Sequence, residues 1–355
     1  MRERAAASIV MVGSDPIMSD TRSQSASNAV DHRQGSLLGV WSREALPDWV
    51  VRGLRGHAHG SVRIGSPLRA VRDALGAANA SEGDLRSFCA AHSQMPILHV
   101  GFGNADEEAA LRNHASVLLT TEPWMRPTGR EVQRALEMPL PGFPHEGSFA
   151  QASEFIAQGA APELLHAASV APSDCGSVLA RLQEVSILLV QWLGIPERVS
   201  AASTAGRLHR AHESQPDASS RLFRLWEGSI AVTCAFTDGR TASITASNRH
   251  WHWRRCALVS GSIGAIYVDD QHMEWRSPTH EVLDTPSPHL TPAHAAADDN
   301  TPSALLSAAL APPLSTGLSP LLLQRVRAVM EASCLSALTG EAESPQAMMD
   351  VLAQA

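Results

Sequence analysis

Two histidines one residue apart, His250 and His252, are the first groups in the sequence that suggest chemistry. On a β-strand, residues two apart point to the same face. Such a pair can ligate zinc, and His272 or Asp269 would be a third ligand. The alternative is an exposed sheet face on which tryptophan and arginine side chains stack. We prefer this alternative, because the sixteen histidines are scattered and form no HExxH motif, and we predict no metal site.

Two residues are candidate nucleophiles. Cys175 stands at the start of an expected helix, a position that can lower a thiol pKa. No histidine accompanies it in the sequence, so we expect a buried thiol. Ser262 lies between two glycines but lacks the strand–turn–helix context of a nucleophile elbow. The five cysteines form no CxxC pair and are an odd number, which favours free thiols over disulfides.

The sequence contains no lysine, and all 28 of its basic side chains are arginine. A mechanism that needs a lysine ammonium as acid, base or Schiff base is therefore excluded. Arginine does not replace it, because a guanidinium keeps its proton at any ordinary pH.

Length, composition and charge limit the classes of protein to which the chain can belong. A length of 355 residues suggests two domains, and a hydrophobic share of 44% allows a sizeable core. The net charge of −8 and the lack of a basic cluster argue against nucleic-acid binding. No apolar run reaches the ~18 residues of a membrane span. The apolar stretch Ala5–Val12 is too short for a secretory signal, so we expect a cytoplasmic protein.

Strands and helices alternate in the first part of the chain, which predicts βα units and a parallel sheet. Apolar, β-branched runs predict strands at 8–13, 36–41, 96–101 and 116–120. Helical spacing predicts helices at 67–77, 84–92, 105–113 and 129–137.

The pattern changes after residue 140. Helices are predicted at 149–159 and 175–193, and the second ends at Gly194. A run of strands follows, predicted at 222–226, 229–236, 240–247, 256–259, 264–268 and 272–275. Strands without helices between them indicate an antiparallel or mixed sheet. A long loop at 284–320 and a closing helix at 321–338 complete the chain.

The sequence contains three segments, at 117–124, 183–201 and 331–341, that occur in this order around the strands of 228–268. Together they resemble the glucose–fructose oxidoreductase / inositol dehydrogenase family (Gfo/Idh/MocA). The resemblance implies an α/β plus α+β architecture. Residues 1–140 would form a Rossmann-like dinucleotide-binding domain with a parallel sheet. Residues 141–355 would form a domain with an open, mostly antiparallel sheet, closed by the helix 321–338.

The residues that the family uses for proton transfer are replaced. The resemblance places Glu122 at the family's lysine, Glu184 at its histidine and Ile187 at its aspartate. Isoleucine does not transfer protons. Glu122 and Glu184 are catalytic candidates if burial raises a pKa, and two adjacent carboxylates would raise it further. The alternative, which we prefer, is that both glutamates are solvent-facing remnants.

The phosphate-binding loop is also degenerate. The family's Gly-x-Gly-x-x-Gly would begin at Gly13, but Asp15 and Pro16 follow in place of the second glycine and a backbone donor. Ser42 and Arg43, after the expected second strand, would suit the 2′-phosphate of NADP, or else form an ordinary strand end. The cofactor-binding residues that the resemblance implies are Gly13, Ser14, Ser42, Arg43, Glu122 and Pro123.

Two hypotheses for function follow. The first is an NAD(P)-dependent oxidoreductase-like protein whose hydride-transfer site has degenerated, with a binding or regulatory role. The second is an active, divergent NADP-dependent reductase of a sugar-like, carbonyl or imine substrate. The cofactor would be NADP or NAD, or would have been lost. We expect a small-molecule ligand in the interdomain cleft. We also expect a homo-oligomer through the C-terminal sheet, with Trp251, Trp253 and Trp275 on its exposed face.

Overall fold

A computed structural model gives the structure of the chain. It describes residues 38–42, 46–55, 62–65, 80–81, 85–91, 96–101, 110–111, 118–123, 137–139, 147–157, 162–204, 228–262, 264–270, 272–279, 281–284, 306 and 318–354. Predictions for 8–13, 67–77, 129–136 and 222–226, and most of those for 105–113 and 284–320, lie outside the described residues. None of the described helices combines the length and the apolar character that a bilayer span requires.

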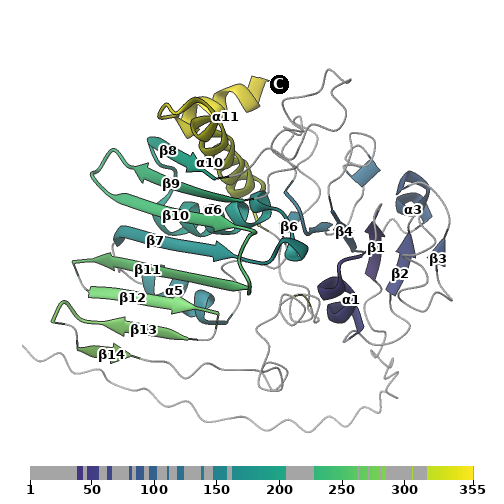
Figure 1. Cartoon of the computed structure of the whole chain (residues 1–355), viewed down its shortest axis with the longest axis horizontal. Coiled ribbons are helices and arrows are strands. Elements are labelled where there is room, and N and C mark those ends of the chain that lie inside the picture. The colour runs from purple at the N-terminus through teal and green to yellow at the C-terminus, as the bar shows by residue number, and fades with distance from the viewer. Residues whose placement is uncertain are drawn as a thin grey trace, which may run out of the picture. The chain divides into compact units, whose positions relative to one another are not determined.

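The first sheet has six strands, and every pair of neighbours is parallel. Its order is β3-β2-β1-β4-β5-β6 (Figure 1). The strands are β1 (Leu38–Ser42), β2 (Val62–Gly65), β3 (Ala80–Ser81), β4 (Ile97–Val100), β5 (Leu118–Thr120) and β6 (Glu137–Pro139). Helices α1 (Asp48–Arg55) and α3 (Leu85–Ala91) lie between strands in the sequence. This is the strand order of a Rossmann fold, so the predicted parallel sheet is confirmed.

The strand predicted at 36–41 is confirmed as β1. It is a central strand of the sheet, hydrogen-bonded to β2 on one side and β4 on the other. In a Rossmann sheet this is the place of the first strand, whereas we predicted it as the second. Apolar runs identify buried strands but not their order in the sheet, which explains the difference.

The second sheet has eight strands in the order β14-β13-β12-β11-β7-β10-β9-β8. Only β7 and β10 run parallel, and all other neighbours are antiparallel. The open, mostly antiparallel sheet is thus confirmed. Its strands are β7 (Pro162–Val170), β8 (Arg198–Ser203), β9 (Ser229–Ala235), β10 (Thr241–Ser247), β11 (Arg254–Gly261), β12 (Gly264–Asp269), β13 (Met273–Arg276) and β14 (Val282–Asp284).

Several elements were absent from the sequence prediction. The most important is β7, the strand that joins the two halves of the large sheet. The others are α1, β2, β3, β6, β14 and a last helix, α11 (Pro345–Gln354). Glu137, predicted as the end of a helix, begins β6 instead. Most of these elements are short, and short segments carry little periodic signal.

Helices cover one face of the large sheet. These are α5 (Gly147–Ala157), α6 (Val178–Leu193) and α10 (Pro320–Thr339), and Figure 1 shows α5 and α6 behind the strands. A short 3₁₀ turn, η2 (Ser173–Cys175), precedes α6. In β9, Ile230, Val232 and Cys234 point into the core while the residues between them are exposed. Alternation of this kind is expected of a sheet with one covered face.

The helix α6 lies at the centre of this core. All of its residues except Gln191 are buried, including its polar ones. Such a helix is enclosed on every side rather than lying on a surface. It packs on β7 and β10 and against α10, and it ends at Gly194, as predicted.

A second apolar cluster links the two sheets. It contains residues of β1, β4 and α1, such as Val40, Leu98 and Trp49, together with Ala171, Cys175 and Trp253 from the large-sheet half. The carboxyl ends of the parallel strands therefore adjoin the start of α6 and the end of the large sheet. The domain boundary that we predicted at residue 140 stays a prediction.

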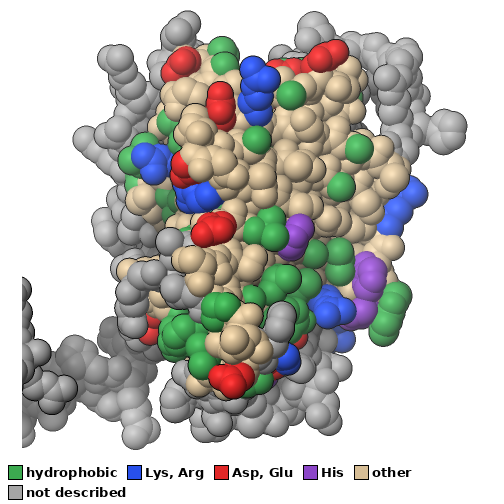
Figure 2. Space-filling view, turned by 90° about the vertical axis from the view of Figure 1, so that its left-hand side faces the viewer, with side chains coloured by type: hydrophobic (Ala, Val, Ile, Leu, Met, Phe, Trp, Pro, Cys, Tyr) green, Lys and Arg blue, Asp and Glu red, His purple; other side chains and the backbone are tan. Residues whose placement is uncertain are grey.

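The other face of the large sheet is uncovered by described helices. On it, Leu258 of β11 pairs with His166 of β7, and both are exposed. Figure 2 shows the side of the molecule that lies on the left of Figure 1, where hydrophobic side chains gather in the lower half.

The three tryptophans expected on the exposed sheet face are distributed differently. Trp253 is buried, and Trp275 is half-buried and packs against Phe155 of α5 on the covered side. Only Trp251, which is 83% exposed, lies at the surface. The expectation was wrong for Trp253 and Trp275, because aromatic content does not reveal which face of a strand a residue occupies.

Candidate functional site

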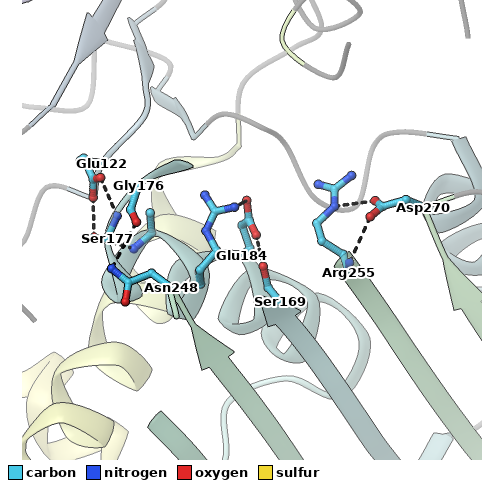
Figure 3. Close-up of polar contacts among 10 residues, drawn as sticks. Glu122, Ser169, Gly176, Ser177, Glu184, Asn248, Arg255 and Asp270 are labelled. Atoms are coloured by element: carbon cyan, nitrogen blue, oxygen red, sulfur yellow. Dashed lines mark hydrogen bonds and ion pairs between the residues drawn. The ribbon is translucent and has the colours of Figure 1, made fainter. Parts of the chain in front are cut away.

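Glu122 follows β5 at the carboxyl end of the parallel sheet, and its side chain is buried, with 6% exposure. Its two carboxylate oxygens accept hydrogen bonds from one residue of the other half. The backbone N–H of Ser177 donates to Oε1 at 2.9 Å, and the Ser177 hydroxyl donates to Oε2 at 2.5 Å (Figure 3). A buried carboxylate needs such partners, because an unsatisfied charge in the interior is very costly.

Ser177 is the N-cap of α6. Its side-chain oxygen accepts a hydrogen bond from the backbone N–H of Ala180 at 3.1 Å, as an N-cap serine does. The carboxylate of Glu122 thus lies at the positive end of the α6 dipole, where negative charge is stabilised. Sequence reasoning overlooked this residue, although a serine after Gly176 and before an apolar run is a recognisable helix start.

Gly176 provides the space for this contact. Its φ of +116° is unfavourable for other residues, and a Cβ at this position would lie 3.2 Å from Glu122 Oε1. Asn248, at the end of β10, supports the same turn. Its amide donates to the Gly176 carbonyl at 3.4 Å and accepts from the Gly228 N–H at 2.9 Å.

Glu184 lies two turns into α6 and is also buried, with 2% exposure. The Ser169 hydroxyl of β7 donates to its Oε2, and Arg181 Nη1 stands 3.3 Å from its Oε1. The Arg181 guanidinium lies 4.0 Å from the centre of the Trp253 ring, within cation–π range. Glu184 is therefore held between a serine, an arginine and the core.

A third carboxylate belongs to the same row. Asp270 accepts from the Arg255 side chain at 2.6 Å and from its backbone N–H at 3.0 Å. Figure 3 shows Glu122, Glu184 and Asp270 spread across the ends of β10, β7 and β11. Arg255 also lies within 5.9 Å of the Trp253 ring. Each of these three carboxylates thus interacts with a serine, an arginine or both.

Burial raises the pKa of Glu122, and the hydrogen bonds from Ser177 and the charge of Arg181 oppose the rise. Burial also raises the pKa of Glu184, opposed by Arg181, Arg255 and Ser169. The interpretation of both glutamates as solvent-facing remnants is thus wrong. It failed because nothing in the local sequence reports the burial of a charged side chain.

The cofactor side of the site departs from a dinucleotide-binding pattern. In this strand order, the turn after β1 is where the pyrophosphate lies and where glycines let the backbone approach it. Here the sequence between β1 and α1 reads Arg43-Glu44-Ala45-Leu46-Pro47 and contains no glycine, and α1 begins with the acid Asp48. Ser42, the last residue of β1, is buried. These residues do not fit a dinucleotide bound in the ordinary way.

This geometry changes the predicted cofactor residues. Ser42 ends β1, which has the place of the first strand of a Rossmann sheet, so Ser42 and Arg43 do not stand at the end of the second strand as we predicted. Arg43 itself, with Gly13 and Ser14, lies outside the described residues. Pro123 is buried beside Glu122. Of the predicted site residues, only Glu122 and Glu184 become parts of one row of buried ions.

The other candidates also have different surroundings from those expected. His250 and His252 lie in the turn between β10 and β11 and not on a strand, and their rings are 4.5 Å apart. Within the described part of the chain, no three potential ligands come together to hold a metal. Burial raises the pKa of Cys175 to about 12, which opposes the lowering that a helix start can cause.

The contact between Gly176 and Glu122 can be tested by adding one methyl group. Gly176→Ala should lower the free energy of unfolding by about 2–4 kcal/mol, since it adds both backbone strain and crowding. Gly239→Ala is the matched control, because Gly239 also has a positive φ, +86°, but nothing lies within 4 Å of its Cβ position. Urea denaturation measures both. An equal loss in the two variants would contradict the contact.

Comparison with known proteins supports the fold. No family model and no curated protein matches the sequence. Among solved structures, an NAD-binding oxidoreductase from Klebsiella pneumoniae has a TM-score of 0.59 at 14% identity, over 87% of this chain and 99% of that one. Levoglucosan dehydrogenase in complex with NADH and levoglucosan has a TM-score of 0.61 at 13% identity, over 88% of this chain and 100% of that one.

A third neighbour, described as a myo-inositol dehydrogenase from Sinorhizobium meliloti, has a TM-score of 0.57 at 16% identity, over 87% of this chain and 99% of that one. The structural neighbours are thus NAD-binding oxidoreductases of the Gfo/Idh/MocA type. At these identities the likeness shows the fold alone. The chain therefore has the fold of the Gfo/Idh/MocA oxidoreductases, as its motifs predicted, at 13–16% sequence identity to these three proteins.

Proposed function

We propose that this chain is an oxidoreductase-fold protein without hydride-transfer activity, which acts as a binding or regulatory protein. The observation that carries the proposal is the fixed position of Glu122. Both of its oxygens accept hydrogen bonds from Ser177, at the place where the resemblance puts the family's proton-donating lysine. The residue holds two parts of the protein together instead of facing a substrate.

The remaining proton-transfer positions support the same conclusion. A general acid or base needs a free lone pair or proton within hydrogen-bond reach of the substrate. The Ser169 hydroxyl donates to Oε2 of Glu184, and its Oε1, which accepts no hydrogen bond among the described residues, lies 3.3 Å from Arg181 Nη1 in a buried ion pair. Ile187 is part of the apolar core. With no lysine in the sequence, no ammonium group can take over the role from elsewhere in the chain.

Weak cofactor binding is the second part of the proposal. The sequence between β1 and α1 lacks the glycines that admit a pyrophosphate, and it contains the acid Glu44 beside Arg43, while α1 begins with a second acid, Asp48. NAD or NADP should therefore bind poorly, if the cofactor has not been lost altogether. The structural neighbours that contain NADH support the general assignment to the oxidoreductase type.

One observation favours the alternative, an active NADP-dependent reductase. Burial raises the pKa values of Glu122 and Glu184, and a raised pKa is what a carboxylic acid needs to donate a proton near neutrality. Substrates such as imines or reactive carbonyls need less help from an acid. In this case one of the two glutamates would leave its present hydrogen bonds during turnover.

Titration with NADPH and NADH separates the two functions. We expect no saturable change in cofactor fluorescence up to a cofactor concentration of ~1 mM, because the sequence between β1 and α1 has no glycine to admit the pyrophosphate. Levoglucosan dehydrogenase, which has the same fold and binds NADH, is the positive control. Tight binding together with turnover that Glu122→Gln abolishes would establish the reductase and overturn our proposal.

The ligand that we propose is a sugar-like or nucleotide-like small molecule in the cleft between the two predicted domains. Its support is the neighbour's complex with levoglucosan and the polar row at the junction of the two sheets. We propose no nucleic-acid or membrane partner.

We also propose that the partner on the open face of the large sheet is a second copy of the chain. The strand register places Leu164, Ala168, Cys256, Leu258 and Ala265 on this face, and the charged Arg254, Glu274 and Arg276 toward its border. A flat surface of this kind is suited to self-association by a two-fold axis. Leu258, with 38% exposure, lies near its middle.

Sedimentation of two variants tests this interface. Leu258→Asp should convert an oligomeric wild type into monomers, since a carboxylate would be buried without a partner. Leu338→Asp, at an exposed leucine on α10, is the control and should remain oligomeric. A monomeric wild type, or an unchanged Leu258→Asp variant, would contradict the proposed interface.

A further inference from the structure

The turn between β10 and β11 carries three aromatic rings that lie close together. The imidazole rings of His250 and His252 have their centres 4.5 Å apart. The Trp251 indole has its centre 3.8 Å from that of the His252 ring and 5.9 Å from that of the His250 ring. Trp251 is exposed and the two histidines are half-buried. The histidine pair is therefore held against an indole at the surface.

The backbone on both sides of the pair is fixed. The Asn248 N–H donates to the Gly228 carbonyl at 3.1 Å, and the His250 N–H donates to the Ala171 carbonyl at 3.0 Å. Trp253, directly after the pair, is buried in the apolar cluster that links the two sheets. A turn that is ordered before a ligand arrives loses little further freedom when the ligand binds.

One nitrogen of each imidazole is engaged or covered, which leaves the other for a ligand. Nδ1 of His250 lies 3.0 Å from the His252 carbonyl oxygen, and the His252 N–H is farther from it, at 3.4 Å. A proton on Nδ1 makes the shorter contact a hydrogen bond and leaves the lone pair on Nε2, as in many metal-binding histidines. Nδ1 of His252 is buried without a hydrogen-bond partner in the described part of the chain, so Nε2 remains for an ion from solvent.

The separation of the two rings is that of two imidazoles on one metal ion. Imidazole nitrogen binds such ions at ~2.0–2.1 Å, which puts the ring centre about 3.2 Å from the metal. Two rings in adjacent positions at right angles then have centres about 4.5 Å apart, whereas tetrahedral positions separate them by about 5.2 Å. The observed 4.5 Å favours the square-planar or tetragonal geometry of Cu(II) and Ni(II) over the tetrahedral geometry of Zn(II).

The charges around the pair keep a ligand neutral. Burial lowers the pKa of His252, and the charges of His250 and Arg254 lower it further. His252 is therefore uncharged at neutral pH, which is the form in which imidazole binds a metal. The Arg254 guanidinium is itself engaged, since its Nη2 donates to the Tyr267 hydroxyl at 3.4 Å.

We propose that His250 and His252 form an exchangeable surface site for one Cu(II) or Ni(II) ion, with water in the other coordination positions. Water is needed, because no third histidine, cysteine or carboxylate joins the pair among the described residues. From the sequence we expected no metal here, and the ring spacing, which a sequence does not contain, reverses that expectation. The site lies outside the row of buried ions and goes beyond the proposed function.

Titration with Cu(II), Ni(II) and Zn(II) in a non-coordinating buffer at neutral pH tests the site. Calorimetry should show that wild type binds one ion more per chain than the double variant His250→Ala/His252→Ala, with Cu(II) bound most tightly. The Cu(II) complex should show splitting from two nitrogen ligands in its electron paramagnetic resonance spectrum. Bound Cu(II) should also quench part of the tryptophan fluorescence, because Trp251 lies against His252.

Single variants make the result specific. His250→Ala and His252→Ala should each weaken Cu(II) binding by at least ~10-fold, because one imidazole no longer holds the ion near the other. His166→Ala, at an exposed histidine of β7, is the matched control and should bind as wild type does. Trp251→Phe should keep the ion and lose the quenching.

Two results would overturn the proposal. One is the lack of saturable binding by wild type up to ~1 mM metal. The other is undiminished binding by the double variant, since the ion would then be held by other histidines. Unfolding midpoints show whether the variants fold. If the double variant does not fold, the spectrum of the wild-type Cu(II) complex decides, and fewer than two nitrogen ligands would contradict the site.

Discussion

The burial of one carboxylate governs this structure. Glu122 carries its charge away from water and meets that cost with two hydrogen bonds from Ser177 and the dipole of α6. The surrounding residues follow from this requirement. Position 176 must be glycine to leave room, and Asn248 must hold the turn that presents the two donors. A lysine at position 122 would place positive charge at the positive end of a helix.

The same requirement extends along the ends of the large sheet. Glu184 and Asp270 are buried with Arg181 and Arg255, and Trp253 lies within cation–π range of both guanidiniums. Buried ion pairs add little stability in themselves, but removing one partner leaves a costly charge behind. Most single substitutions in this row of buried ions should therefore destabilise the protein. It is a structural arrangement built on positions that the family resemblance assigns to proton transfer.

Local sequence patterns were enough to predict much of the fold. The end of α6 at Gly194 and the strands predicted at 229–236 and 240–247 depend on nearby residues, and the structure has them. The order of the parallel strands was not predictable in this way. The central place of the run at 36–41 follows only from the hydrogen bonds of β1 to β2 and β4. The strand β7, with its mixture of alanine, leucine and histidine, gave no clear period.

The candidate site was predicted in its residues but not in its chemistry. Glu122 and Glu184 were located through the resemblance, yet their burial depends on Ser177, Ser169 and Arg181. Two of these partners are distant in sequence, by 55 residues for Ser177 and Glu122 and by 15 for Ser169 and Glu184. A sequence pattern reports which groups are present. The distances between them, and hence their roles, come from tertiary packing.

The coupling between Glu122 and Ser177 tests the central claim most directly. A double-mutant cycle with Glu122→Ala, Ser177→Ala and the combined variant isolates it from the separate role of Ser177 as helix cap. For a buried, charge-assisted pair, the account predicts a coupling free energy of unfolding of about 1.5–3 kcal/mol. Additive effects of the two substitutions, with a coupling under about 0.5 kcal/mol, would contradict it.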